Sequence, residues 1–355
     1  MTVGGSNAPE SAAPSAPRMG PWTLSGPFAL SPMADFTCWP LRLLAQEFGA
    51  AFSCTEMVKA KFVAQRHADT LNSLARHPGE RLVGGQICGG DPDELARAAG
   101  IVAHELGFPF VDFNIACPIR RVVSEGAGGG LLADPPRVER LVRILVEAAA
   151  PAPVTVKMRS GLDEQNITAV EVAQAAEAGG AIAVALHPRT VRQGYGGRAD
   201  HEVVKAVKAA VEVPVIGGGD MRSAADAVRL LRETGCDVAY FGRAATGQPW
   251  IFRHAMALWR GEEASPETEA GAWLNVFQRH VEGLLEHWDE RTAILHTRRL
   301  AREYAAACPG GPESSAARRF YERHKQVESR AQWEDAMAAT AQDVSGAGDL
   351  QQPTV

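Results

Sequence analysis

The sequence predicts an α/β protein with a (β/α)8, or TIM, barrel followed by a small all-helical C-terminal domain. Between residue 28 and about residue 255, short apolar runs alternate with amphipathic helical stretches, and eight such units are present. Most of the apolar runs are continuous, as in parallel strands that are buried on both faces. A doubly wound sheet is the alternative, but it rarely needs eight units, and no Gly-x-Gly-x-x-Gly sequence follows the first strand.

The units of the barrel follow one another along the chain. The expected strands are Phe28–Ser31, Ala51–Cys54, Leu82–Gln86, Phe110–Asn114, Val154–Val156, Ile182–Leu186, Val213–Ile216 and Val238–Phe241. The expected helices between them are Pro92–Glu105, Pro135–Ala149, Ala169–Ala178 and Ala224–Glu233. Asp91 and Asp134 precede the prolines that begin the first two helices, and an aspartate in this position caps a helix N-terminus well.

Composition divides the chain into four segments. We predict a disordered tail at residues 1–20, the barrel at residues 21–255, the helical domain at residues 256–340 and a second disordered tail at residues 341–355. The first segment is rich in Ala, Ser, Pro and Gly, and strand-like runs stop near Arg253. The helices expected in the C-terminal domain are Glu269–Trp288, Thr292–Ala307 and Ser315–Ala338.

Cysteine spacing and hydropathy exclude several classes of protein. The six cysteines are scattered without a Cys-x-x-Cys pair, so we expect no disulfide scaffold and no metal site. The chain lacks an apolar run of the roughly 20 residues that a membrane helix needs, and its N-terminus lacks a signal-peptide core. We therefore expect a cytoplasmic protein that does not contact a membrane. Nothing in the pattern indicates an obligate protein partner, so we expect a monomer.

Unusual polar or glycine residues follow nearly every expected strand. They are Pro32, Met33 and Ala34 after the first strand, Gln86 after the third, Asn114 and Cys117 after the fourth, Lys157 and Arg159 after the fifth, His187 and Arg189 after the sixth, Gly218, Gly219 and Asp220 after the seventh, and Gly242 and Arg243 after the eighth. Active sites of (β/α)8 barrels lie at the carboxyl ends of the strands. The sequence therefore predicts an active site at this rim.

The loops after the seventh and eighth strands are typical of phosphate binding. Barrels of this class usually bind phosphate there, because glycines let the backbone approach the anion and a helix N-terminus faces it. Arg243 adds a cation. The alternative for Gly218 and Gly219 is a plain tight turn. His187 is either a ligand of the phosphate or substrate or a structural histidine.

Three further rim residues have a functional and a structural interpretation. Lys157 directly follows a buried strand, which makes a plain surface lysine the less favoured alternative. Gln86 can donate and accept hydrogen bonds at the edge of a ring, or it can be a satisfied core amide. Cys117 could be a small buried apolar residue. However, Pro118, two arginines and a glycine-rich loop follow it, which indicates a place on the rim.

Taken in order, these motifs resemble those of the tRNA-dihydrouridine synthases, most closely the bacterial B-type subfamily. The resemblance covers about Leu30 to Phe252. It is carried by Ser31–Ala34, Asp112–Pro118, Pro153–Gly161, Leu186–Thr190, Gln193–Tyr195, Gly218–Asp220 and Gly242–Arg243. The chain departs from the family pattern at three positions, where Ala116 and Pro188 replace glycines and Gly218 replaces an asparagine.

The resemblance implies an oxidoreductase that uses FMN and NADPH to reduce specific uridines in tRNA to 5,6-dihydrouridine. Hydride would pass from flavin N5 to C6 of uracil, and Cys117 would be the catalytic proton donor to C5. FMN contacts are implied for Pro32, Met33, Ala34, Gln86, Asn114, Lys157, His187, Gly218, Gly219, Asp220, Gly242 and Arg243. Substrate contacts are expected from Arg159, Arg189, Tyr195, Arg298 and Arg299.

Two other functions remain open at the level of sequence. One is a TIM-barrel FMN oxidoreductase that acts on a free pyrimidine or another small molecule. The helical appendage and the Gln193–Tyr195 match weigh against it. The other is a non-catalytic RNA-binding barrel, against which Cys117 and Lys157 argue. The basic residues of the helical domain are expected to bind tRNA phosphates, but helical arginines interleaved with glutamates can also form a plain solvated face.

Overall fold

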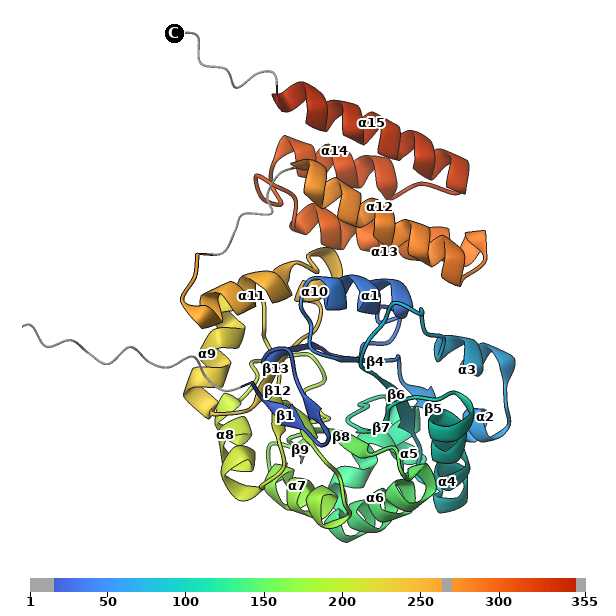
Figure 1. The fold of residues 1–355 in the computed structure, drawn as a ribbon, viewed down its shortest axis with the longest axis vertical. Helices are drawn as coiled ribbons and strands as arrows, with labels where there is room; N and C mark the ends of the chain where they lie inside the picture. The colour runs from blue at the N-terminus through green and yellow to red at the C-terminus, as the bar shows by residue number, and fades with distance from the viewer. Residues whose placement is uncertain (1–15, 264–269, 349–355) are drawn as a thin grey trace, which may run out of the picture.

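The computed structural model describes residues 16–263 and 270–348, and its centre is a closed parallel barrel (Figure 1). The barrel strands are β3 (Phe28–Leu30), β4 (Ser53–Cys54), β6 (Val83–Cys88), β7 (Phe110–Ile115), β8 (Val154–Arg159), β11 (Val184–His187), β12 (Val215–Gly217) and β13 (Val238–Phe241). Each pairs in parallel with the next along the chain, β4 pairs with β6, and β13 pairs with β3. The predicted fold class is confirmed, and the expected strands match these within a few residues.

Helices surround the barrel on its outer face, and shorter helices lie in its loops (Figure 1). They are α1 (Trp39–Glu47), α2 (Ala60–Ala64), α3 (Ala68–Ser73), α4 (Pro92–Gly100), α5 (Arg120–Ser124), α6 (Pro135–Ala149), α7 (Ala169–Ala178), α8 (His201–Ala210), α9 (Ala224–Thr234), α10 (Ala244–Gly247) and α11 (Ile251–Arg260). The helix expected at Pro92–Glu105 changes after Gly100 into a π-helical turn, Ile101–Glu105. Asp91 and Asp134 cap α4 and α6 as predicted, since their side chains accept hydrogen bonds from backbone N–H groups.

Two short strand pairs lie outside the barrel ladder, and one further short strand pairs with a barrel strand. β1 (Arg18–Met19) pairs with β2 (Trp22–Thr23), and this hairpin closes the amino end of the barrel, where Trp22 contacts Phe110 at the start of β7. β5 (Val58–Lys59) extends the carboxyl end of β6, and β9 (Gly161–Asp163) pairs with β10 (Asn166–Ile167) after β8. The expected tail at residues 1–20 is therefore wrong at its boundary, because Met19 is buried. Residues 1–15 lie outside the described residues.

Four helices form the C-terminal domain: α12 (Ala270–His287), α13 (Glu290–Ala306), α14 (Ser315–His324) and α15 (Arg330–Gly348). They share a core of aromatic and aliphatic side chains, in which Phe277 contacts Tyr304 and Phe320. The single helix expected at Ser315–Ala338 is wrong, because the chain turns between α14 and α15. The tail expected at residues 341–355 is also misplaced, since α15 continues to Gly348. Residues 349–355 lie outside the described residues.

The boundary expected at residue 255 falls inside α11. The buried face of α11 (Ile251, Phe252 and Ala255) packs into the core of the barrel, and the helix ends at Gly261, which adopts a left-handed conformation. The expected boundary is too early because α11, although helical, belongs to the barrel. The helical domain therefore begins with α12.

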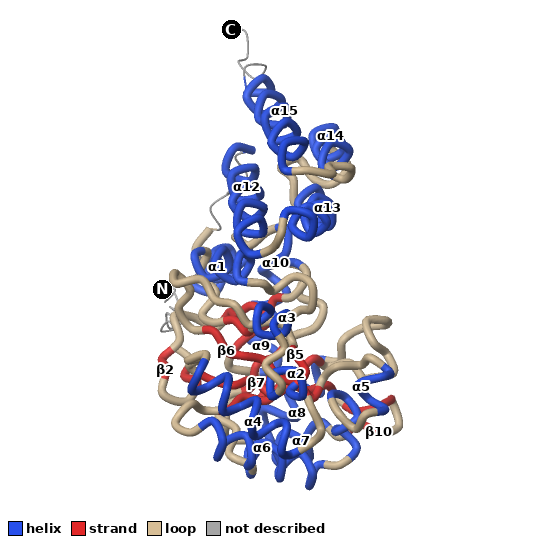
Figure 2. The backbone as a smooth tube through the Cα atoms, turned by 90° about the vertical axis from the view of Figure 1, so that its right-hand side faces the viewer, coloured by secondary structure: helices blue, strands red, loops and turns tan. Residues whose placement is uncertain are grey.

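The helical domain sits on the side of the barrel at α1 and α10 (Figure 2). Two glycines permit the close approach of helices there. A Cβ on Gly283 of α12 would lie 2.8 Å from Pro40 of α1, and a Cβ on Gly247 of α10 would lie 2.2 Å from the backbone carbonyl oxygen of Glu303 in α13. Figure 2 also shows α5 and β10 at the carboxyl end of the barrel, the end toward which α13 and α14 lie.

Replacing Gly247 with alanine is expected to lower the free energy of unfolding by about 1–3 kcal/mol, because the new methyl group must push apart two backbones. Thermal unfolding measures this. Gly271→Ala in α12 is the matched control: none of the described residues lies within 4 Å of its Cβ position, so alanine should not lower the free energy of unfolding there. Equal melting temperatures for the two variants would contradict this packing.

Candidate active site

The predicted rim residues of the third, fourth and fifth barrel strands meet inside the carboxyl end of the barrel. Gln86 on β6 is in register with Asp112 on β7, and Asn114 is in register with Lys157 on β8. Gln86, Asp112 and Asn114 are all buried. The alternating pattern of the strands points these side chains to the same side of the sheet.

A chain of hydrogen bonds joins these residues. The Asp112 carboxylate accepts from the Thr155 hydroxyl and from Gln86 Nε2, both at 2.6 Å. Asn114 Nδ2 donates to Gln86 Oε1 at 2.9 Å. The structure thus brings Gln86 and Asn114 together as predicted, but it ties Gln86 into the core, with only 1% of its surface exposed.

Cys117 lies at the end of this chain of bonds. Asn114 Oδ1 accepts from the backbone N–H groups of Ala116 and Cys117 at 2.9 and 3.0 Å, so the end of β7 is held by its own side chain. The Cys117 carbonyl accepts from Gly129 N at 3.0 Å. Gly128, at φ 53°, leaves 3.0 Å between its Cβ position and the Cys117 Cβ, so the glycine-rich loop packs directly on the cysteine. The Cys117 side chain stays 8% exposed.

Lys157 supplies a cation within this buried group. Burial, together with the neighbouring Arg159 cation, lowers the pKa of its ammonium from 10.5 to about 8, whereas Asp112 acts in the opposite direction. Lys157 and Arg159 are two residues apart on β8, so both face the same side of the strand. The site thus holds a cation that is partly shielded from solvent.

The two arginines predicted to contact substrate are largely used within the protein. Arg159 is buried and donates from Nε to Ala116 O, and from Nη1 to Thr190 O and Gly194 O. Arg159 therefore links the cysteine loop to the loop after β11. Its Nη2 group makes none of these bonds.

Arg189 is also buried, and it donates to the carbonyl groups of Gly196 and Gly197 and to both oxygens of Asp220. The Ala199 backbone N–H and the Arg189 guanidinium together lower the pKa of Asp220, against the effect of burial. Arg189 and Asp220 thus form an ion pair that fixes the loops after β11 and β12. The Asp220 carboxylate is therefore engaged within the protein.

Tyr195 is the exposed member of the predicted site, with 67% of its surface accessible. The Arg159 and Arg243 guanidinium groups lie 5.6 and 5.5 Å from the centre of its ring, and the His187 ring lies 6.2 Å away. The structure thus brings together residues from the loops after β8, β11 and β13. An exposed aromatic ring between two cations is suited to stacking on a base.

The loops after β12 and β13 offer unused backbone donors. The N–H groups of Gly219, Gly242 and Arg243 have no hydrogen-bond partner within the described ranges. Gly218 N donates to Leu186 O, which fixes the start of the turn after β12. Gly219 has φ 88°, a left-handed conformation that favours glycine. The Arg243 side chain is exposed. Two adjacent loops with free N–H groups and a cation have the chemistry of a phosphate site.

His187 lies at the same end but carries no charge. Burial lowers its pKa to about 2, with a further contribution from the neighbouring cations. Its Nε2 atom faces Arg189 Nη1 at 3.3 Å and accepts from it. His187 can therefore donate from Nδ1 to a ligand, but it cannot provide a positive charge.

The loop after β3 carries Pro32, Met33 and Ala34. Thr37 accepts from Met33 N and donates to Met33 O, both at 3.0 Å, which closes this loop. Met33 also meets the loop after β13, since its sulfur lies 3.5 Å from the Cβ position of Gly242. The first and eighth strands thus place their predicted residues side by side.

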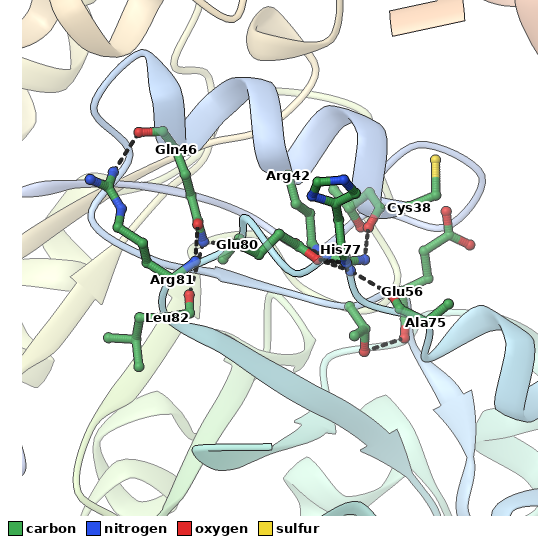
Figure 3. A network of polar contacts seen from close by, with 12 residues as sticks. Cys38, Arg42, Gln46, Glu56, Ala75, His77, Glu80, Arg81 and Leu82 are labelled. Atoms are coloured by element: carbon green, nitrogen blue, oxygen red, sulfur yellow. Dashed lines mark hydrogen bonds and ion pairs between the residues drawn. The ribbon is translucent and has the colours of Figure 1, made fainter. Parts of the chain in front are cut away.

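Glu56 is a rim residue that the sequence analysis missed. It follows β4, and its carboxylate faces the backbone of Asp35 and Phe36, while Oε1 has no hydrogen-bond partner among the described residues. Burial raises its pKa to about 7. Figure 3 shows Glu56 and Cys38 beside the buried Arg42–Glu80 ion pair. Glu56 follows the second barrel strand, so the rule that polar residues after barrel strands mark the site applies to it as well.

Arg298 and Arg299 lie on α13, away from the polar chain at Cys117. Arg298 Nε donates to Val327 O at 2.6 Å, which ties α13 to the turn before α15. Arg299 is exposed and lies 3.5 Å from Asp35 in the loop after β3. Other basic residues of this domain are paired with carboxylates: Arg318, Arg319, Arg323, Lys325 and Arg330. Arg302 is exposed and makes no such pair with any residue that the structure describes.

The described part of the chain contains no group of three or more His, Cys, Asp or Glu side chains placed to hold a metal ion. In the same part, none of the helices is both long enough and apolar enough to cross a membrane. The polar side chains at the rim therefore define the candidate site.

The fold and the site define a (β/α)8-barrel protein with a buried lysine and a loop cysteine at the carboxyl ends of its strands. Among solved structures, morphinone reductase in complex with tetrahydroNAD has a similar fold, with a TM-score of 0.50 and 12% identity over 73% of this chain and 93% of that chain. At this identity the likeness shows the fold alone.

Comparison of sequences is more specific. The model of the Dihydrouridine synthase (Dus) family matches residues 29–343. tRNA-dihydrouridine synthase B of Pseudomonas aeruginosa is 36% identical over 84% of this chain and 90% of its own length. A probable tRNA-dihydrouridine synthase of Mycobacterium tuberculosis is 34% identical over 85% of this chain and 79% of its own length. The chain belongs to the dihydrouridine synthase family of oxidoreductases, and its relatives include the B-type subfamily.

Proposed function

We propose that this protein reduces specific uridines in tRNA to 5,6-dihydrouridine, with FMN as its cofactor and NADPH as the reductant. The observation that carries the proposal is the fixed position of Cys117, which Asn114 holds at the rim of the barrel near the buried Lys157 cation. Membership of the family supports the same activity. The fold alone does not, because (β/α)8 barrels host many reactions.

The residues at the rim fit FMN. The buried Lys157 cation suits the N1–C2 edge of a flavin, where negative charge grows on reduction. The free N–H groups of Gly219, Gly242 and Arg243, with the Arg243 guanidinium, suit the phosphate. Met33 and Pro32 would line the ring, and His187 would donate a neutral hydrogen bond. When bound, FMN would supply the hydride for C6 of uracil, and NADPH would be the source of that hydride.

Cys117 provides the proton in this reaction. A thiol carries a proton that it can give up as a general acid. Asn114 and the Gly128–Gly129 loop fix the backbone on either side of this thiol, so that it is presented toward the substrate. The proton goes to C5 of uracil, which completes the saturation of the C5–C6 bond.

The uridine has to leave its stack to reach the rim. An enzyme that acts on a base within folded RNA must extrude the base into its pocket, which costs a few kcal/mol. Tyr195, exposed between Arg159 and Arg243, offers a ring on which a base can stack and thereby repay part of this cost. We therefore assign to Tyr195 a contact with tRNA rather than with the cofactor.

The helical domain would hold the rest of the tRNA through α13. Replacing Arg299 and Arg302 together with alanine is expected to weaken tRNA binding and to reduce the slope of log affinity against log salt by about two, because each contact to a phosphate releases counterions. Arg298 is a poorer choice, since it holds the turn at Val327. Filter binding at several salt concentrations measures this slope.

The control for that measurement is Arg143→Ala, which removes an exposed, paired arginine from α6 on the outer wall of the barrel. Its salt slope should equal that of the unmodified protein. If replacing Arg299 and Arg302 leaves the slope of log affinity against log salt unchanged, these arginines form only a solvated face.

The proposed activity is tested by incubating the purified protein with FMN, NADPH and an unmodified tRNA transcript, and by mass spectrometry of the nucleosides. We expect dihydrouridine in the tRNA and no reduction of free uracil. Reduction of free uracil or another free pyrimidine, with none in tRNA, would instead favour a small-molecule oxidoreductase. The helical domain and the exposed Tyr195 favour the tRNA substrate.

A further inference from the structure

Asp112 is a buried carboxylate that the proposed reaction does not use. It lies in the middle of β7, two residues before Asn114, and only 1% of its surface is exposed. Burying a carboxylate is costly unless its oxygens accept hydrogen bonds and a cation lies near. Asp112 has both, because Thr155 and Gln86 donate to its two oxygens at 2.6 Å and Lys157 attracts its charge.

The position of this carboxylate determines which way two amide side chains face. An ionised carboxylate only accepts hydrogen bonds, so Gln86 must turn its NH2 group toward Asp112. The Gln86 oxygen then faces Asn114, which must present its own NH2 group. The Asn114 oxygen is left to face the backbone N–H groups of Ala116 and Cys117.

We propose that Asp112 is a positioning residue, whose carboxylate orients Gln86 and Asn114 and thereby holds the backbone of Cys117. Asp112 touches neither the substrate nor the reacting atoms in this arrangement. It acts through two intervening side chains. The consequence for catalysis rests on the proposed function, but the effect on the position of Cys117 does not.

The test is the rate at which iodoacetamide alkylates Cys117 in the protein without FMN, read by peptide mapping so that the other five cysteines are scored separately. Asp112→Asn keeps the shape of the side chain and removes its charge. Charged hydrogen bonds are stronger than neutral ones by about 1.4 kcal/mol. The state in which the Cys117 backbone is released from Asn114 should therefore become about tenfold more populated. We expect alkylation of Cys117 to become faster by about the same factor.

Two variants separate orientation from simple loss of stability. Thr155→Val removes the other hydrogen bond to Asp112 but leaves the carboxylate facing Gln86, so alkylation should stay within about twofold of the unmodified protein. Asp112→Asn combined with Gln86→Glu moves the carboxylate one position along the chain of bonds. The new carboxylate again accepts from Asn114 Nδ2, so the alkylation rate should return toward its original value.

Activity provides a second measurement. With FMN bound, Asp112→Asn should lower kcat for dihydrouridine formation and leave KM for tRNA unchanged. If Asp112→Asn fails to fold, Gln86→Met breaks the same chain one link later and must give the same increase in alkylation.

The proposal is overturned if Asp112→Asn leaves alkylation of Cys117 unchanged, if Thr155→Val accelerates it equally, or if the double variant shows no rescue. Failure of the proposed function gives another result. The alkylation rates then change as expected, but the unmodified protein forms no dihydrouridine.

Discussion

Replacing Cys117 with alanine is expected to remove nearly all dihydrouridine formation while leaving FMN binding and flavin reduction by NADPH intact. The reduced enzyme would lose its proton donor but keep every residue proposed to hold the cofactor. General acid catalysis of this kind contributes about 10²–10⁴-fold, so the rate of tRNA reduction should fall by that factor. Stopped-flow bleaching of the flavin measures the first half of the reaction, and mass spectrometry of the tRNA measures the second.

Cys88→Ala is the matched control for this experiment. Cys88 ends β6 and packs in the same apolar cluster as Cys117, but burial raises its pKa to about 12, and it takes no part in the hydrogen bonds that join Asp112, Gln86 and Asn114. Its replacement should leave both half-reactions unchanged. Full tRNA reduction by the Cys117→Ala variant would rule out Cys117 as the acid.

Replacing Lys157 with methionine is the second change with a large expected effect. Methionine has a similar length without the charge, so the variant should bind FMN at least about tenfold more weakly and undergo slow flavin reduction. Fluorescence titration with FMN measures the affinity. Lys205→Met, at an exposed position of α8, is the control and should bind FMN as the unmodified protein does.

The same lysine predicts a dependence on pH. Its pKa in the folded protein is lowered to about 8, so the ammonium is charged below this pH and becomes neutral as the pH rises through it. The affinity of the unmodified protein for FMN should therefore fall as the pH increases past about 8, whereas the Lys157→Met variant should not show this step. A step of equal size in both proteins would assign the titration to another group.

Much of the barrel could be predicted from sequence, for a physical reason. Parallel strands are buried on both faces, so they appear as continuous apolar runs, and their carboxyl ends meet at one rim. Lys157 and Asn114, on different strands, could be expected near each other for that reason alone. The start of α6 was equally clear, because Asp134 and a proline mark it.

The roles of the buried arginines could not be predicted in this way. Arg159 and Arg189 lie at strand ends as ligand-binding residues do, but Arg159 donates to carbonyl groups of loops that are distant in sequence, and Arg189 donates to carbonyl groups of its own loop and to Asp220. Only the folded loops reveal those partners. The same holds for Gln86, whose hydrogen bonds to Asp112 and Asn114 depend on the register of β6 and β7. Asp112 itself gives no sequence signal beyond its place in an apolar strand.

The helical domain was predicted less well than the barrel. The turn between α14 and α15 lies in a polar stretch without proline or glycine, so helical periodicity runs through it unbroken. The α13 helix shows the opposite case, where Arg298 and Arg299 are adjacent in sequence but one holds a turn and the other faces solvent. Tertiary contacts decide both outcomes.

The most direct test of the central claim is to map dihydrouridine in tRNA from cells that lack this chain. Mass spectrometry or primer extension should show that specific uridines are no longer reduced in the deletion strain. The unmodified gene should restore them, and the Cys117→Ala gene should not. An unchanged pattern of dihydrouridine in the deletion strain, with no activity of the purified protein on its tRNA, would contradict the proposed function.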